Sequence, residues 1–272
     1  MRLRSLLFVP GDRPERFAKA AASGADALIL DLEDSVAPER KRAARDAVAG
    51  HVFAGGPTIL VRINPIDNAE HAADLELLRI ARPDSVVLPK AEGAASIGAL
   101  GIDLPILPIA TETPAAIFQL GSYAAVADRL LGLTWGAEDL PAAIGAATSR
   151  EADGGYTAPY QLARSLTLFG AHAAGVPAIE TVYPDFRDLD GLAAYAARGR
   201  RDGFTGMMAI HPAQVPVIHA AFTPSPDEVA EAQRLVALFD ANPGAGALQL
   251  DGRMVDAPHL KAAKRLLSLA AG

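Results

Sequence analysis

The alternation of two kinds of segment constrains the fold of this chain most strongly. Eight short apolar runs recur between residues 5 and 211, and longer stretches with apolar residues at spacings of three and four lie between most of them. This pattern is typical of strands and helices that alternate in a parallel sheet. The predicted strands are residues 5–9, 27–32, 58–63, 85–89, 105–110, 130–135, 178–183 and 206–211.

Eight strand–helix units favour a TIM barrel, the (β/α)8 fold, which usually takes ~250 residues. An open doubly wound sheet is the alternative. No G-x-G-x-x-G follows the first predicted strand, so the dinucleotide-binding form of that fold lacks its fingerprint. The predicted helices are residues 14–23, 38–48, 69–81, 114–127, 159–175 and 189–199, with a further short one after Lys90.

The C-terminal part of the chain does not repeat the alternation. We therefore predict a barrel over residues 1–222 and a helical extension over residues 223–272. The extension is expected to hold a helix at 226–241, a glycine-rich loop with the sequence NPGAGALQLDG, and a last helix at 257–270.

Composition excludes several classes of protein. The chain has 272 residues and no cysteine, which excludes disulfides, thiolate metal sites and cysteine nucleophiles. A formal net charge of −7 argues against a nucleic-acid partner, which would need a basic face. No apolar run approaches the ~18 residues of a membrane span, and Pro10 and Gly11 interrupt the first run too early for a signal peptide. We expect a cytoplasmic protein with neither a membrane nor a nucleic-acid partner.

Polar residues stand at the carboxyl ends of the predicted strands, where barrel enzymes carry their active sites. Each lies about one strand–helix unit after the previous one, so these side chains should converge on one mouth of the barrel. They are the DLED run at 31–34, Arg62, Lys90, Glu112, and the adjacent pair Glu138 and Asp139.

Carboxylates held together repel one another unless a proton or a cation separates them. Glu112 and the pair at 138–139 offer only oxygen ligands, which suit a hard cation such as Mg²⁺. Arg62 and Lys90 would add positive charge beside them. The combination predicts a small anionic substrate that is chelated to the metal and held by a guanidinium.

Each of these residues also has a purely structural interpretation. Asp139 could cap the helix that follows it. The DLED run could be a solvated loop or an ion-pair network, and Arg62 could pair with one of its acids. Lys90 could be an ordinary loop lysine. The convergence of all of them at one end favours a functional site.

The motifs resemble those of the citrate lyase beta-subunit-like branch of the HpcH/HpaI aldolase family, which also contains malyl-CoA and citramalyl-CoA lyases. The resemblance spans nearly the whole chain and keeps the family's order. It rests on LLFVPGDRPERFAKA (6–20), LILDLEDSV (28–36), VRIN (61–64), LPKAE (88–92), ETP (112–114), WGAEDL (135–140), AIETVYPDFRD (178–188), IHPAQV (210–215) and GRMVDAPHL (252–260).

The resemblance implies a TIM barrel, commonly trimeric, that uses Mg²⁺ and binds an acyl-CoA and a 2-oxo acid. It implies Glu112 and Asp139 as the metal ligands, with Glu112 also near the substrate. Arg62 would bind the oxo or hydroxyl oxygen of the substrate, and the backbone of Gly136 and Ala137 would hold its carboxylate.

Three further roles follow from the resemblance. Asp256 would be an acid/base that enters the site of a neighbouring subunit, although as a residue alone it reads as a cap of the last helix. Glu33 would orient Arg62 or metal-bound water, and Lys90 would contribute its charge toward the substrate rather than form a Schiff base.

The implied reaction is a reversible Claisen-type cleavage of a 3-hydroxy-3-carboxyacyl-CoA to an acyl-CoA and a 2-oxo acid. The alternatives are a metal-dependent aldolase on free 2-oxo acids, a lyase subunit that acts on a carrier protein inside a complex, and a barrel that binds 2-oxo acids without catalysis.

Overall fold

A computed structural model describes residues 2–51 and 56–271 and divides the chain into two compact units. One is Leu3–His219, and the other comprises residues 220–271 together with residue 2. The predicted division after residue 222 stays a prediction. No helix in the described ranges has the length and hydropathy that crossing a bilayer would require.

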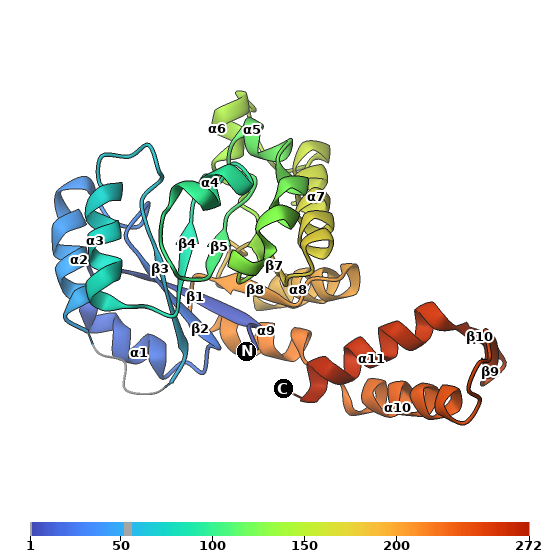
Figure 1. Cartoon of the computed structure of the whole chain (residues 1–272). Coiled ribbons are helices and arrows are strands. Elements are labelled where there is room, and N and C mark those ends of the chain that lie inside the picture. Colours follow the sequence, from blue (N-terminus) through green and yellow to red (C-terminus); the bar gives the residue numbers. More distant parts are fainter. Residues whose placement is uncertain (1, 52–55, 272) are drawn as a thin grey trace. The chain divides into compact units, whose positions relative to one another are not determined.

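The larger unit is a nearly closed barrel of eight parallel strands surrounded by helices, as predicted (Figure 1). The strand order is β5-β4-β3-β2-β1-β8-β7-β6. The ring is completed between β5 and β6, where the Leu131 amide donates to the Ile106 carbonyl at 2.8 Å and the Ala110 amide donates to the Thr134 carbonyl at 2.9 Å. The strands are β1 (Ser5–Pro10), β2 (Ala27–Asp31), β3 (Thr58–Arg62), β4 (Ser85–Leu88), β5 (Ile106–Pro108), β6 (Leu133–Thr134), β7 (Ala178–Glu180) and β8 (Gly206–Ala209).

The barrel interior explains why these runs are apolar throughout rather than alternating. Every residue of β2 is buried, because one side faces the barrel axis and the other faces the helices. The inward side chains form a single cluster of buried residues. Its members are Leu3, Leu6, Ala27, Ile29, Leu60, Val87, Leu107, Ile109, Ile179 and Met208.

The helices follow most of the predicted ranges. The predicted helix at 114–127 is wrong in one respect, because it is two elements: α5 (Pro114–Ile117) and a 3-10 helix, η3 (Leu120–Arg129). η3 packs closely on α7, since a Cβ at Gly170 would lie 2.9 Å from the Leu120 carbonyl oxygen. The other helical elements of the barrel unit are η1 (Pro14–Arg16), α1 (Phe17–Ala21), η2 (Pro38–Arg40), α2 (Lys41–Ala49), α3 (His71–Ala81), α4 (Ala94–Ala99), α6 (Leu140–Ile144), α7 (Ala158–Ala174), α8 (Leu189–Asp202) and most of α9 (Gln214–Phe222).

The C-terminal unit contains the predicted helical extension, with α10 (Pro226–Asp240) and α11 (Ala257–Ala271). The predicted glycine-rich loop is wrong for its second half, which forms an antiparallel hairpin of β9 (Ala247–Leu250) and β10 (Arg253–Asp256). Asp251 and Gly252 form the turn with φ of +50° and +80°. An Asp-Gly pair with two positive φ angles is typical of a two-residue hairpin, so the sequence did carry the signal.

Candidate active site

A cavity of about 340 Å³ lies at the carboxyl ends of the strands, and several predicted site residues line it together. Such a volume falls within the range of small-molecule sites. The strand ends bring these residues together from distant parts of the sequence, as predicted. Arg62, Glu112, Gly136, Ala137, Glu138 and Asp139 all contribute to its wall.

Arg62, at the end of β3, is held by two acids at the end of β2 and just after it. Its Nε and one terminal nitrogen donate to the two carboxylate oxygens of Asp31, both at 2.6 Å, and its other terminal nitrogen lies 2.8 Å from Glu33 Oε2. Phe8 lies under the guanidinium at 4.9 Å. The alternative that Arg62 pairs with the DLED run is therefore confirmed, and the same side chain still faces the cavity.

Asp31 and Arg62 each shift the pKa of the other in the direction that favours its charged form. Burial tends to raise the pKa of the Asp31 carboxyl, but the Arg62 guanidinium outweighs it and lowers that pKa. Burial tends to lower the pKa of Arg62, and Asp31 raises it well above its usual range. A bidentate pair of this kind fixes the direction of the guanidinium as well as its charge.

Lys90 and Glu33 form the next layer. Lys90 Nζ donates to Glu33 Oε1 at 2.7 Å and lies 3.3 Å from Asp139 Oδ1. Glu33 is buried between Lys90 and Arg62 and does not line the cavity. This placement suits the predicted orienting function of Glu33, and its catalytic role stays a prediction.

Lys90 also adopts a left-handed backbone conformation, with φ of +52°. A lysine in this region is strained, at a cost of about 1–3 kcal/mol. The conformation directs the Lys90 amide to Glu112, which accepts its hydrogen bond at 2.7 Å. Lys90 is therefore more than an ordinary loop lysine, because both its backbone and its ammonium serve this site.

Glu112 and Asp139 are neighbours, as the metal prediction requires. Burial raises the pKa of Glu112 to about 8; the Lys90 amide opposes this shift, and the charges of Asp139 and Glu33 add to it. The Glu112 side chain can pack against the backbone at residue 136 because that residue is glycine: a Cβ there would lie 2.8 Å from Glu112 Cγ. The charge of Asp139 therefore favours a protonated Glu112 in the metal-free chain, and a cation bound beside both would favour the ionised form.

The two carboxylates suit Mg²⁺, which needs few protein ligands, better than a metal whose ligands all come from the protein. Across residues 2–51 and 56–271, no three Asp, Glu or His side chains converge to hold a metal ion. Mg²⁺ commonly takes one or two carboxylates and completes its shell with water and substrate. Glu112 and Asp139 both line the cavity, and their assignment as the metal ligands stays a prediction.

Two residues of the site were not singled out from the sequence. Asp31 orients Arg62, and the Thr111 hydroxyl both accepts from the Gly136 amide at 3.1 Å and donates to the Gly136 carbonyl at 3.0 Å. Asp31 lies in the DLED run, and Thr111 directly precedes Glu112, so both stand beside residues that the sequence did single out. Their role becomes visible only when the neighbouring strand supplies the partner.

Asp256 belongs to the C-terminal unit, at the end of β10. Its carboxylate contacts His259 Nδ1, and that hydrogen bond lowers the pKa of Asp256. The Asp256 amide in turn lies 3.3 Å from the same nitrogen, in the manner of a helix cap before α11. The assignment of Asp256 to a neighbouring subunit's site stays a prediction.

Comparison with known proteins agrees with this fold. The sequence model of the HpcH/HpaI aldolase/citrate lyase family matches residues 4–212, and the chain belongs to that family. The resemblance drawn from the motifs is therefore confirmed.

Relatives that carry three different names align with nearly the whole chain. A citrate lyase subunit beta-like protein of Mycobacterium tuberculosis is 42% identical, with 96% of this chain and 93% of that protein covered. A (3S)-malyl-CoA thioesterase of Cereibacter sphaeroides is 34% identical, covering 98% and 94%. The mitochondrial citramalyl-CoA lyase of Rattus norvegicus is 33% identical, covering 98% and 86%.

Solved structures are similar as well. The protein CitE from Mycobacterium tuberculosis in complex with magnesium, acetoacetate and coenzyme A superposes with a TM-score of 0.88 at 39% identity, covering 99% of this chain and 98% of that one. The citrate lyase beta subunit of M. tuberculosis complexed with oxaloacetate and magnesium gives a TM-score of 0.75 at 42% identity, covering 81% and 96%.

Proposed function

We propose that this chain is a Mg²⁺-dependent carbon–carbon lyase that cleaves, or forms, a 3-hydroxy-3-carboxyacyl-CoA to give an acyl-CoA and a 2-oxo acid. The observation that carries the proposal is the arrangement of Glu112, Asp139 and Arg62 around one cavity beside the backbone of Gly136 and Ala137. Relatives named for CoA thioesters, and related structures that hold magnesium with oxo acids, support it.

Glu112 and Asp139 would hold the ion, which when bound acts as a Lewis acid toward the substrate oxygens. The amides of Gly136 and Ala137 would position the substrate carboxylate. Asp31 engages two of the five N–H donors of Arg62, and Glu33 lies 2.8 Å from the other terminal nitrogen. Each terminal nitrogen thus keeps one N–H, which would serve the oxyanion that develops at the hydroxyl oxygen. Lys90 and Glu33 would keep Arg62 and Asp139 in place.

In the cleavage direction, a base removes the hydroxyl proton and the carbon–carbon bond breaks. Its electron pair passes to the thioester as an enolate, which is then protonated to the acyl-CoA while the other fragment leaves as the 2-oxo acid. Asp256 of another subunit is our candidate base. Its contact with His259 lowers its pKa and so keeps it ionised at neutral pH, as a base must be.

The test is an assay of the purified protein with citramalyl-, malyl- and citryl-CoA, with and without Mg²⁺. We expect metal-dependent release of acetyl-CoA and a 2-oxo acid from one of them. Release of free CoA and the intact hydroxy acid would instead show hydrolysis of the thioester, the activity that the name of the Cereibacter relative indicates. If no thioester reacts while free 2-oxo acids are cleaved, the aldolase alternative replaces our proposal.

The trans role of Asp256 can be tested by complementation. Arg62→Ala chains and Asp256→Asn chains should each be inactive. If Asp256 enters a neighbouring subunit's site, co-refolding the two variants should restore part of the activity, since some sites then receive both intact residues. Absence of restoration in mixed oligomers would show that Asp256 acts within its own chain or not at all. Light scattering of the same samples tests the proposed homotrimer.

A further inference from the structure

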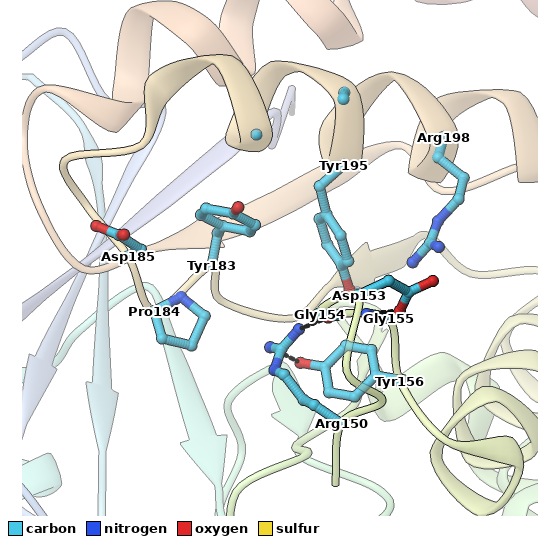
Figure 2. Close-up of a pocket in the computed structure, with 12 residues that line it drawn as sticks. Arg150, Asp153, Gly154, Gly155, Tyr156, Tyr183, Pro184, Asp185, Tyr195 and Arg198 are labelled. Carbon is cyan, nitrogen blue, oxygen red and sulfur yellow. Dashed lines mark hydrogen bonds between the residues drawn. The ribbon is translucent and has the colours of Figure 1, made fainter.

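A second cavity of about 530 Å³ lies in the barrel unit and shares no lining residue with the candidate active site (Figure 2). Its walls come from the segment before α7, from the loop after β7 and from one face of α8. Gly191, Ala194, Tyr195 and Arg198 of α8 follow the spacing of three and four, so a whole helical face is turned toward the cavity.

The walls combine aromatic rings with two arginines. Tyr183 and Tyr195 lie with ring centroids 5.8 Å apart, and Tyr156 is buried on the other side. Arg150 stacks over Tyr156 at 4.0 Å and is fixed there by hydrogen bonds to the Tyr156 hydroxyl at 2.9 Å and the Gly154 carbonyl at 3.0 Å. One arginine is thus already ordered by the wall itself.

Arg198 differs, because among the described residues its guanidinium has neither a hydrogen-bond nor an ion-pair partner. Its Nε is buried without a hydrogen-bond partner. The guanidinium lies over the ring of Tyr195, 5.0 Å from the ring centroid, in a cation–π contact. Figure 2 shows it extending from α8 toward the segment that carries Asp153 to Tyr156. A buried donor of this kind normally has a partner.

The acids at the rim do not supply that partner. Asp153 accepts a hydrogen bond from the Gly155 amide at 2.9 Å, and Asp185 accepts from the Arg187 amide at 3.0 Å. Both side chains are exposed and occupied with their own turns. The cavity therefore offers a cationic donor group with aromatic surface around it.

We propose that this cavity is a second small-molecule site, which binds an anion with a planar or aromatic body through the guanidinium of Arg198. A guanidinium matches carboxylate and phosphate alike with its two parallel N–H groups. The tyrosine rings provide the stacking and edge contacts that a flat group uses. The volume accommodates a ligand of that size.

The only tryptophan of the chain gives this site an optical reporter. Trp135 packs edge-to-face on Tyr156, with ring centroids 5.1 Å apart. Its indole also donates to Glu180, the residue that accepts from the Tyr195 hydroxyl at 3.0 Å. A ligand between Tyr156 and Tyr195 should therefore change the emission of Trp135.

The experiment titrates the metal-free full chain with benzoate and with phenyl phosphate, followed by Trp135 fluorescence and calorimetry. Benzyl alcohol is the uncharged control. We expect saturable binding of at least one anion and none of the alcohol. Preference for benzoate would indicate a carboxylate ligand, and preference for phenyl phosphate a phosphate ester. Either preference supports the proposal.

Arg198→Gln should weaken that binding by about tenfold or more, the loss expected for one charge-assisted contact. Arg201→Gln is the matched control, because Arg201 stands on the same helix with its side chain 73% exposed, and it should bind as the unmodified chain does. If Arg198→Gln does not fold, Arg198→Lys replaces it, and the loss of the planar fork should act in the same direction.

Three results would overturn the proposal. The first is the absence of saturable binding of either anion, and the second is equal binding by the Arg198 variant. The third is displacement of the probe by coenzyme A or oxaloacetate, which would assign the cavity to the substrate of the proposed reaction. Because binding is read without turnover, failure here leaves the proposed lyase function untouched, and the reverse also holds.

Discussion

Two buried glutamates of the barrel, Glu112 after β5 and Glu180 at the end of β7, show how differently the same side chain can be used. Their exposed fractions are 5% and 0%. Within the described residues, the Glu112 carboxylate accepts one hydrogen bond, from the Lys90 amide. Glu180 accepts from Trp135, Arg164, Tyr195 and the Thr181 amide.

The difference lies in the number of partners rather than in burial. Glu180 lies among the indole of Trp135 and the side chains of α7 and α8, and Arg164 is bound in turn by Asp202 at 2.8 Å. Each carboxylate oxygen of Glu180 thus has a side-chain donor, which indicates a structural role. Glu112 lies beside the carboxylates of Asp139 and Glu33 and accepts a hydrogen bond only from the Lys90 amide among the described residues, so it has fewer donors than Glu180. In this protein an unsatisfied buried acid, more than a buried acid as such, marks the candidate site.

The largest expected effect is a difference in kcat/KM between variants of Arg62, near Glu112, and of Arg164, which binds Glu180. Arg62→Lys should lower kcat/KM by about 10²–10³-fold, because lysine keeps the charge near Asp31 but loses the fork that serves the oxyanion. Arg164→Lys should leave kcat/KM of the folded fraction almost unchanged. Steady-state kinetics of both variants, with circular dichroism as the check on folding, measure this. A similar loss in both would remove the distinction between the networks.

Stability should show the opposite ranking. Glu180→Ala leaves the charge of Arg164 buried with a single acid and should cost about 3–5 kcal/mol of the free energy of unfolding. Glu112→Gln replaces a carboxyl that is largely protonated near neutral pH by a neutral amide of similar shape, so it should cost little or nothing. Urea unfolding at pH 7.5 without Mg²⁺ compares them. An equal loss for Glu112→Gln would mean that its carboxylate is structurally satisfied after all.

The pH dependence follows from the raised pKa of Glu112, about 8 in the folded, metal-free chain. The folded state binds a proton more tightly than the unfolded state, so the stabilisation from protonated Glu112 is complete below the ordinary carboxyl pKa and is lost as the pH rises through about 8. Between pH 6 and pH 9 the chain should therefore lose stability relative to Glu112→Gln. Thermal melts of both, without Mg²⁺, test the sign.

The same proton competes with the metal. Because Glu112 must ionise to bind Mg²⁺, the affinity for Mg²⁺ should fall by about tenfold for each pH unit below about 8. Calorimetry in buffers of different ionisation enthalpy should detect the released proton. Constant affinity across this range would show that Glu112 is not a metal ligand.

The smallest effect should come from Lys90→Met. Lys90 is partly exposed and holds Glu33 and Asp139 by ion pairs, so its loss should cost about 1 kcal/mol, or roughly fivefold in kcat. Borohydride added with a 2-oxo acid should trap no adduct on the unmodified chain. A trapped adduct, or complete loss of turnover in the variant, would indicate a Schiff base in place of the electrostatic role.

Much of the barrel could be predicted from the sequence. All eight strands were found because each buried strand is a short apolar run, and the strand-end residues followed because parallel strands place their carboxyl ends at one mouth. The hairpin at 247–256 was also within reach, since Asp251-Gly252 is a strong local turn signal. Such local patterns can be recognised in the sequence because a strand or a turn requires the same residue types wherever it lies in the fold.

What the sequence alone determined was therefore the order of the elements and the set of residues at their ends. Only the tertiary structure decided that Asp31 and Glu33 both hold Arg62, and that Lys90 turns its amide to Glu112. It also decided that Glu180 rather than Glu112 gathers the donors. Those choices depend on distances between strands and helices far apart in the chain. The energy of a charge in the interior is set by such neighbours, and no local pattern records them.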